Sequence, residues 1–183
     1  MRLAESIRAL NSKILSADSA TCALRKWCDD HRIGGDGPIL AKKQPHVDIV
    51  QPGDEFLSAL LPAPGEVIQH RRVTLSRSGI ALSDCDLWWM PSRLDESMTA
   101  ELDSTDIPFG IVVAPLNPTR HTLYEAVLPT GHTHILEHRA LVISGVSPQW
   151  PIAAVRELYR RELIERPWRL NTATRSQPHN SSV

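Results

Sequence analysis

The sequence predicts an α+β fold in which helices come first and a largely antiparallel sheet follows. Two observations support this prediction. Before residue 34, apolar residues recur at helical spacing, whereas from residue 67 onward they alternate with polar residues, as in strands that bury one face. The 183 residues suffice for one domain with a substantial core. We expect that domain to span residues 1–166, with N-terminal helices over 1–33 and the sheet region over 65–161, followed by a polar, disordered tail over 167–183.

The N-terminal part is expected to form two helices. The first, over residues 1–16, has an apolar stripe made by Leu3, Ile7, Leu10 and Ile14. Asp18-Ser19 is typical of an N-cap and opens a second helix that ends near Arg32. A glycine-rich break over 34–37 then ends the helical part.

The remaining elements are mostly strands. Residues 39–50 have weak strand character, and residues 92–104 have helical spacing. Residues 77–79 can turn a hairpin. We expect strands over 67–76, 80–90, 109–114, 119–128 and 135–144. Residues 149–161 fit either a helix, by propensity, or a strand, by the order of the preceding sheet.

Composition excludes several classes of function. The net charge is −1 and no basic block is present, which argues against a nucleic-acid partner. No apolar run approaches the length of a membrane span, and Glu5 and Arg8 stand where a signal peptide would need apolar residues. Three cysteines without a disulfide framework indicate reduced thiols and a cytoplasmic protein.

One arginine stands on the apolar face of a predicted strand. Arg71 alternates in phase with Val73 and Leu75, whereas Arg72 points to the other face. A buried guanidinium costs several kcal/mol unless an anion lies beside it. The anion would be an internal carboxylate or the carboxylate of a ligand. Alternatively, Arg71 lies at the sheet edge and its head group reaches solvent.

Four short motifs, in this order along the chain, give the predicted sheet region a resemblance to known proteins. They are Arg71-Arg72-Val73-Thr74-Leu75, then Trp88-Trp89-Met90-Pro91 followed by Leu94, then Asp106-Ile107-Pro108-Phe109-Gly110, and Pro118-Thr119-Arg120. Over residues 65–159 the chain resembles chorismate lyase and the related UTRA-like effector-binding domain of GntR-type transcription regulators. The resemblance implies a six-stranded antiparallel sheet flanked by helices.

The resemblance also implies a set of substrate-binding residues. Arg71 matches the inward arginine that holds the carboxylate of the aromatic product, and Phe109 matches the residue whose backbone N–H helps to bind that carboxylate. Gly110 and Arg120 complete the implied set. A second arginine of the lyase pattern is absent, and that region has the sequence Cys85-Asp86-Leu87-Trp88.

A looser match over residues 151–158 places the family's glutamate at Glu157. Arg71 and Glu157 would then be the catalytic residues of a chorismate pyruvate-lyase. Arg71 would hold a carboxylate, and Glu157 would protonate the departing enolpyruvyl oxygen to release pyruvate and a hydroxybenzoate. This chemistry needs no metal or cofactor. Two alternatives stay open: the fold binds a small aromatic carboxylate without turnover, or Arg71 and Glu157 only pair with each other.

Histidines suggest a rival metal site. His132 and His134 alternate on a predicted strand, and Glu137 and His138 follow, in a cupin-like arrangement. Solvated histidines beside the turn at residues 129–131 are the simpler interpretation, and we expect no metal there.

Overall fold

The computed structural model describes residues 2–44 and 51–165, so the tail expected over 167–183 lies outside the described residues. The helices are α1 (Arg2–Leu15), α2 (Ala20–His31), α3 (Asp54–Leu60), α4 (Glu96–Ser104) and α5 (Phe109–Val112), with 3₁₀ turns η1 (Pro91–Arg93), η2 (Ala114–Leu116) and η3 (Arg161–Leu163). The strands are β1 (Ile39–Lys43), β2 (Gln69–Arg77), β3 (Ile80–Trp89), β4 (Thr119–Val127), β5 (His134–Ile143) and β6 (Pro151–Arg160).

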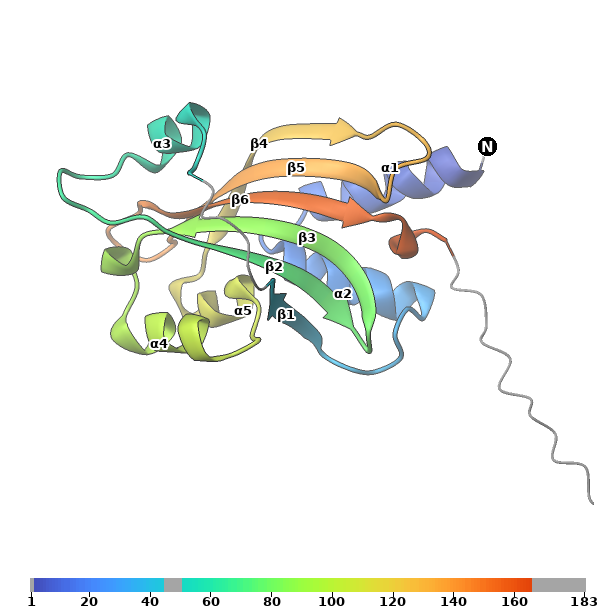
Figure 1. Ribbon diagram of the computed structural model, residues 1–183, viewed down its shortest axis with the longest axis horizontal. Helices are drawn as coiled ribbons and strands as arrows, with labels where there is room; N and C mark the ends of the chain where they lie inside the picture. The colour runs from blue at the N-terminus through green and yellow to red at the C-terminus, as the bar shows by residue number, and fades with distance from the viewer. Residues whose placement is uncertain (1, 45–50, 166–183) are drawn as a thin grey trace, which may run out of the picture.

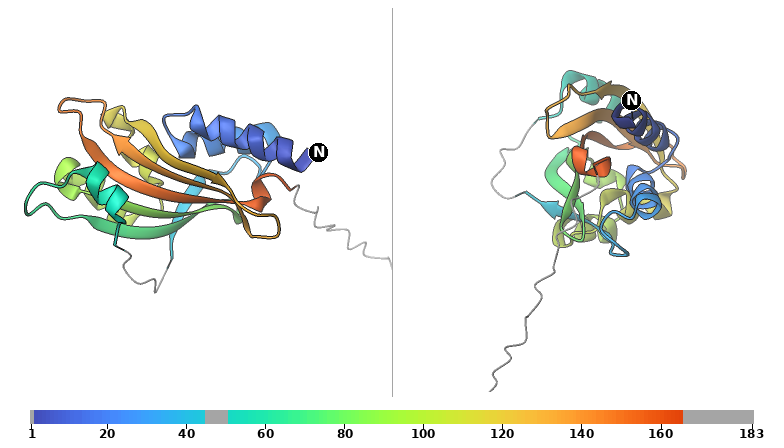
Figure 2. Two further views of the ribbon diagram at one scale, coloured as in Figure 1. Left: turned by 90° about the horizontal axis from the view of Figure 1, so that it is seen from above. Right: turned by 90° about the vertical axis from the view of Figure 1, so that its right-hand side faces the viewer.

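The strands form one six-stranded antiparallel sheet in the order β1-β2-β3-β6-β5-β4. Helices α1 and α2 lie on one face of this sheet, and α3 lies on the other (Figures 1 and 2). The α+β prediction with its six-stranded antiparallel sheet is therefore confirmed. None of the described helices is long and apolar enough to cross a membrane.

The N-terminal helices begin and end where the sequence predicts. In α1, Ile7, Leu10 and Ile14 of the predicted stripe are buried, whereas Leu3 is exposed. Helix α2 begins after Ser19, whose Oγ accepts a hydrogen bond from the backbone N–H of Cys22. This bond satisfies one of the free amides of the first helical turn. Both helices pack their apolar stripes against the sheet.

Two segments settle or correct the sequence-based prediction. The ambiguous residues 149–161 form the central strand β6, between β3 and β5. The strand expected over residues 109–114 is wrong, because the chain there forms the short helix α5 and then η2. Periodicity cannot tell a short apolar run in a strand from a buried helical turn. Here Pro108 sets the extended backbone before the first turn, and Gly110 allows α5 to approach α2 closely.

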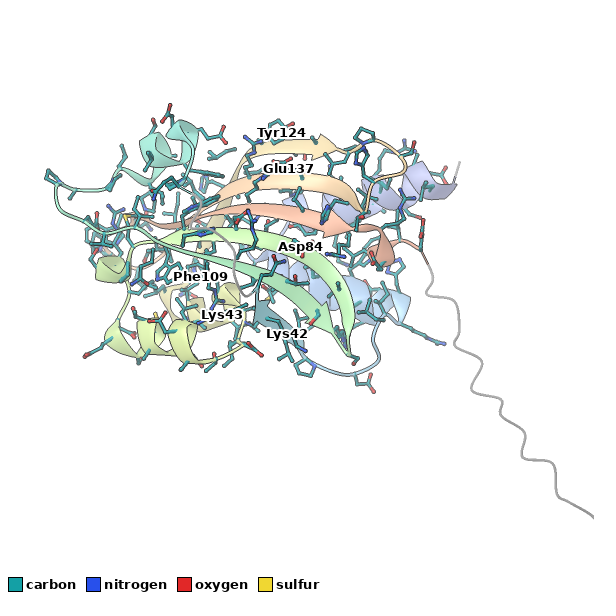
Figure 3. All side chains as sticks on the ribbon, viewed as in Figure 1. Lys42, Lys43, Asp84, Phe109, Tyr124 and Glu137 are labelled. Carbon is teal, nitrogen blue, oxygen red and sulfur yellow. The ribbon has the colours of Figure 1, made fainter. Side chains whose placement is uncertain are left out.

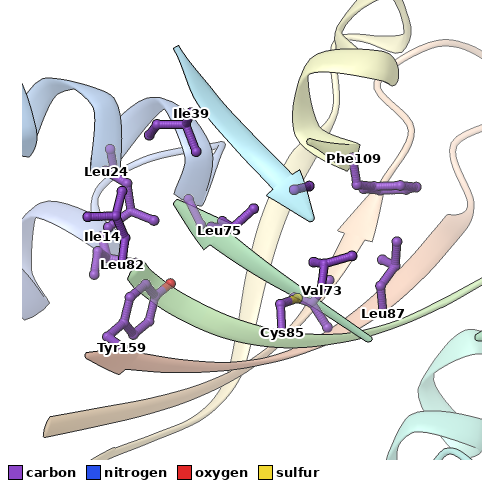
Figure 4. Close-up of a cluster of buried hydrophobic side chains, with 14 of the residues drawn as sticks. Ile14, Leu24, Ile39, Val73, Leu75, Leu82, Cys85, Leu87, Phe109 and Tyr159 are labelled. Carbon is purple, nitrogen blue, oxygen red and sulfur yellow. The ribbon is translucent and has the colours of Figure 1, made fainter. Parts of the chain in front are cut away.

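The two faces of the sheet differ in character. The face covered by α1 and α2, here called the helical face, carries the main hydrophobic core. In this core Val73, Leu87 and Phe109 face one another (Figure 4). The opposite face carries a smaller cluster under α3 that includes Trp88, whereas Trp89 belongs to the main core. Beyond that cluster the opposite face is covered with ion-paired side chains, among them those of Asp84 and Glu137 (Figure 3).

Candidate functional site

A cavity of about 60 Å³ lies on the helical face of the sheet. This is several times the space that one water molecule needs. All five residues proposed from the sequence line it: Arg71, Phe109, Gly110, Arg120 and Glu157. They come from β2, α5, β4 and β6, which are distant in sequence and are brought together by the strand order.

Arg71 reaches the cavity wall from the centre of β2. Its residue surface is only 7 % exposed, so the orientation expected from strand alternation is the observed one. Its Nη1 donates to the carbonyl of Leu102 at 2.7 Å and its Nη2 to the carbonyl of Ile107 at 3.3 Å. Among the described residues, Nε has no hydrogen-bond partner and no carboxylate lies within ion-pair distance of the guanidinium.

Helix α4 positions the carbonyl that holds Arg71. The helix is capped by Asp95, whose carboxylate accepts from the N–H of Met98 at 2.7 Å. Leu102 lies in the last turn, where carbonyls lack helical partners and the helix dipole favours a cation. Burial lowers the pKa of Arg71, but a guanidinium stays charged at neutral pH. Neutral carbonyls thus orient this buried positive charge. Asp103 and Asp106 lie near enough to favour the charged form, but no carboxylate of the described residues lies within ion-pair distance.

Arg120 and Glu157 form an ion pair elsewhere on the cavity wall. Arg120 Nη2 donates to Glu157 Oε2 at 2.7 Å, and both side chains are buried. The hydroxyl of Tyr159 donates to the same Oε2 at 2.8 Å. Glu157 therefore pairs with Arg120, and the alternative in which it pairs with Arg71 is wrong.

Behind this pair lies a buried histidine. His138 Nδ1 is 3.4 Å from Arg120 Nη2, and its Nε2 is 2.6 Å from Asn11 Oδ1. A neutral ring protonated on Nε2 satisfies both contacts, because it then accepts from the guanidinium and donates to the amide oxygen. Burial, followed by the charge of Arg120, lowers the pKa of His138 and favours this neutral form.

The sequence missed one wall of the cavity. Asp18, Ser19 and Thr21, at the start of α2, line it together with Gly110. An added Cβ on Gly110 would lie 2.8 Å from Ser19 Oγ, so the first turns of α2 and α5 are in close contact here. The Asp18-Ser19 pair was recognisable as a helix cap, but nothing local signals that the capped end faces a cavity.

The rest of the wall is mostly apolar. Val73, Leu75, Leu87, Val142 and Val155 line it between the polar groups. The thiol of Cys85 lies among them, and burial raises its pKa well above the usual range. This wall suits the apolar body of a small ligand.

The histidines weighed as a metal site are separated. His134 Nε2 contacts Asp84 Oδ2 at 2.7 Å, whereas His138 is buried beside Arg120. Within residues 2–44 and 51–165, no group of three or more His, Cys, Asp or Glu side chains could hold a metal ion.

Comparison with solved structures supports the fold. PhnF from Mycobacterium smegmatis superposes with a TM-score of 0.52, over 82% of this chain and 67% of its own, at 12% identity. The separate effector domain of PhnF gives a TM-score of 0.49 over 79% of this chain and 90% of its own, also at 12% identity. At 12% identity, the superposition shows that this chain shares the fold of PhnF, and it shows no more than the fold.

A third structure is YydK of Bacillus subtilis, described as a possible transcriptional regulator. It aligns over 72% of this chain with a TM-score of 0.46 and 14% identity. The chain spans 62% of the length of YydK.

Comparison by sequence shows the family. No family model matches the chain. A protein of Sinorhizobium fredii, the uncharacterized protein y4mC, is 32% identical over 184 aligned positions, which cover 88% of this chain and 76% of y4mC. The chain therefore belongs to the same family as y4mC.

Proposed function

We propose that this chain is a small-molecule-binding domain whose cavity holds the carboxylate of an organic acid. The observation that carries the proposal is Arg71, a buried guanidinium that lines the cavity and has no carboxylate partner in the described part of the chain. Leaving a buried charge unpaired is costly, and a ligand carboxylate would remove that cost. Charge-assisted hydrogen bonds from guanidinium to carboxylate are among the strongest that proteins make.

Other features of the site support this proposal. The backbone of Phe109 and Gly110, in the first turn of α5, borders the same cavity, and amides at that position lack helical partners. The apolar wall would cover the body of the acid, and Arg120 would orient its far end. The three cysteines are free thiols, which supports the cytoplasmic location proposed from composition.

A matched pair of variants tests the proposal. Arg71→Ala should weaken binding of 4-hydroxybenzoate by roughly 10- to 150-fold, the equivalent of a hydrogen bond to a charged group. Arg72→Ala is the control: the adjacent residue is also an arginine, but it pairs with Asp86 on the opposite face. Calorimetry and ligand-induced shifts of the melting temperature measure both. Equal affinity in wild type and Arg71→Ala would contradict the proposal.

A second candidate function is the chorismate pyruvate-lyase activity implied by the resemblance. It is favoured by Glu157, a carboxylate that lines the same cavity as Arg71. In this reaction Arg71 would hold a carboxylate of chorismate. Glu157, ionised beside Arg120, would take the proton that the ring loses on aromatisation and pass it to the enolpyruvyl oxygen as the bond from that oxygen to the ring breaks.

Release of pyruvate distinguishes the two candidates. A lyase should produce pyruvate and a hydroxybenzoate from chorismate without added metal. Glu157→Gln should lower kcat, because it removes the group that moves the proton and keeps the shape of the side chain. Binding of 4-hydroxybenzoate without pyruvate release, at micromolar protein, would leave only the binding function.

A further inference from the structure

Few of the described side chains that line the cavity are ionisable. Its ionisable side chains are Asp18, Arg71, Cys85, Arg120 and Glu157. The buried thiol of Cys85 is neutral, since its pKa is raised well above the usual range. Arg120 and Glu157 neutralise each other across 2.7 Å. Among the described residues that line the cavity, Arg71 is therefore the one cation without a carboxylate at ion-pair distance.

A second negative group on a ligand would find no matching cation in the part of the lining that the structure describes. The wall between Arg71 and the ion pair is built from Val73, Leu87 and Val155 together with Cys85. A carboxylate placed there would lose its water without gaining an ionic partner. Near the ion pair it would compete with Glu157 for Arg120, and beside α2 it would be repelled by Asp18.

We infer, on the basis of the proposed function, that the cavity selects acids with a single negative charge. The ligand class is a monocarboxylate with an apolar body and an uncharged far end, and dicarboxylates are excluded. The carboxylate binds Arg71, and the neutral end contacts the Arg120–Glu157 pair. Chorismate has two carboxylates and falls in the excluded class, so release of pyruvate from chorismate would overturn this inference in favour of the second candidate function.

Two probes of nearly equal shape separate charge from size. Monomethyl terephthalate carries one negative charge near neutral pH, and terephthalate carries two. Titration calorimetry on the full chain should show monomethyl terephthalate and 4-hydroxybenzoate binding, with terephthalate at least roughly 100-fold weaker, the effect expected for a buried carboxylate without a partner. Equal affinity for the ester and the diacid would overturn this inference and leave the proposed function intact.

A variant should reduce the selectivity. Glu157→Gln keeps the shape of the side chain but frees the charge of Arg120, so terephthalate should bind at least roughly 10-fold more tightly than it does to wild type, as a charge-paired carboxylate should. Glu137→Gln is the matched control, because it removes a similarly buried carboxylate from the other face of the sheet. It should not change the selectivity. An unchanged preference in Glu157→Gln would overturn the assignment of the ion pair as the selective element.

The proposed function fails in a different way. If neither 4-hydroxybenzoate nor monomethyl terephthalate binds the wild-type chain, both the proposed function and this selectivity are overturned. The comparison of the two wild-type affinities needs no variant, so it remains decisive even if Glu157→Gln does not fold.

Discussion

Adjacent arginines on β2 have opposite environments. Arg72 lies on the face of the sheet opposite the helical face. There its Nε and Nη2 both donate to the carboxylate of Asp86, at 2.7 and 2.8 Å. Arg71, one residue earlier, is buried against neutral carbonyls beside the cavity. Strand geometry alone separates them, since successive side chains point to opposite faces. That Arg71 has no carboxylate partner among residues 2–44 and 51–165 is therefore a property of its position and not of the residue type.

His138 gives the protein a dependence on pH at the residue scale. Its folded-state pKa lies below the unfolded value of about 6.5, because burial and then Arg120 disfavour the charged ring. Between these two pKa values the unfolded chain binds a proton that the native chain does not. The free energy of unfolding should therefore fall as the pH falls through this window, by at most about 1.4 kcal/mol per pH unit.

Urea denaturation at several pH values between about 5 and 8 tests this dependence. The carboxylates of Asp84, Asp86 and Glu137, whose pKa values are lowered, act at more acidic pH. We expect His138→Gln to flatten the slope below about pH 6.5, because the variant has no ring to protonate. His121→Gln, which removes an imidazole from the exposed strand β4, is the control. A wild-type slope in His138→Gln would refute the assignment.

At the scale of elements, the contact between α2 and α5 closes one side of the cavity. Gly110 lies in the first turn of α5, and a Cβ there would come within 2.8 Å of Ser19 Oγ. In an ordinary helix, replacing glycine by alanine stabilises the helix by roughly 0.5–1 kcal/mol. Here the added Cβ would push Ser19 Oγ away from the N–H of Cys22 that it caps, which should reverse that sign.

We expect Gly110→Ala to lower the free energy of unfolding by about 1–3 kcal/mol, as overpacking does. Ser19→Ala alone should cost about 1 kcal/mol through loss of the cap of α2. Because Ser19→Ala also removes the clashing Oγ, the double variant should be less destabilised than the sum of the single variants. Chemical denaturation of the four proteins measures this coupling. Additive effects would mean that the two elements adjust independently.

At the scale of the whole molecule, the two ends of the described chain are packed together. The indole Nε1 of Trp27 in α2 donates to the carbonyl of Leu163 in η3 at 2.8 Å. Ile7 and Leu163 belong to the same buried hydrophobic cluster. Strand β6, near the C-terminal end, lies between β3 and β5 at the centre of the sheet. The helices and the sheet are therefore expected to unfold together.

Truncation tests the single domain proposed over residues 1–166. A chain of residues 1–166 should unfold in one cooperative transition and bind 4-hydroxybenzoate as the full chain does. A chain of residues 1–150 lacks β6 and the core that it carries, so it should show no cooperative transition. Circular dichroism and calorimetry distinguish these outcomes. Loss of folding in the 1–166 chain would place the domain boundary elsewhere.

The sequence by itself determined the features that depend on local periodicity and capping. The alternation around Arg71 predicted its inward orientation, and Ser19 predicted the start of α2. These signals are local because side-chain direction and helix capping depend on residues a few positions apart. The resemblance added Glu157, Phe109 and Arg120 as candidate site residues, and the structure brings them to the cavity that Arg71 lines.

Only the tertiary structure decided which of these residues interact. Glu157 pairs with Arg120, which is 37 positions away and comes from a strand that is not its neighbour in the sheet, so no local pattern could identify the partner. The apolar run after Pro108 forms a helix that packs closely against the start of α2 at Gly110, a contact between segments about 90 residues apart that periodicity does not show. Charge pairing and close packing depend on distances across the fold, and those distances are set only when all six strands have assembled.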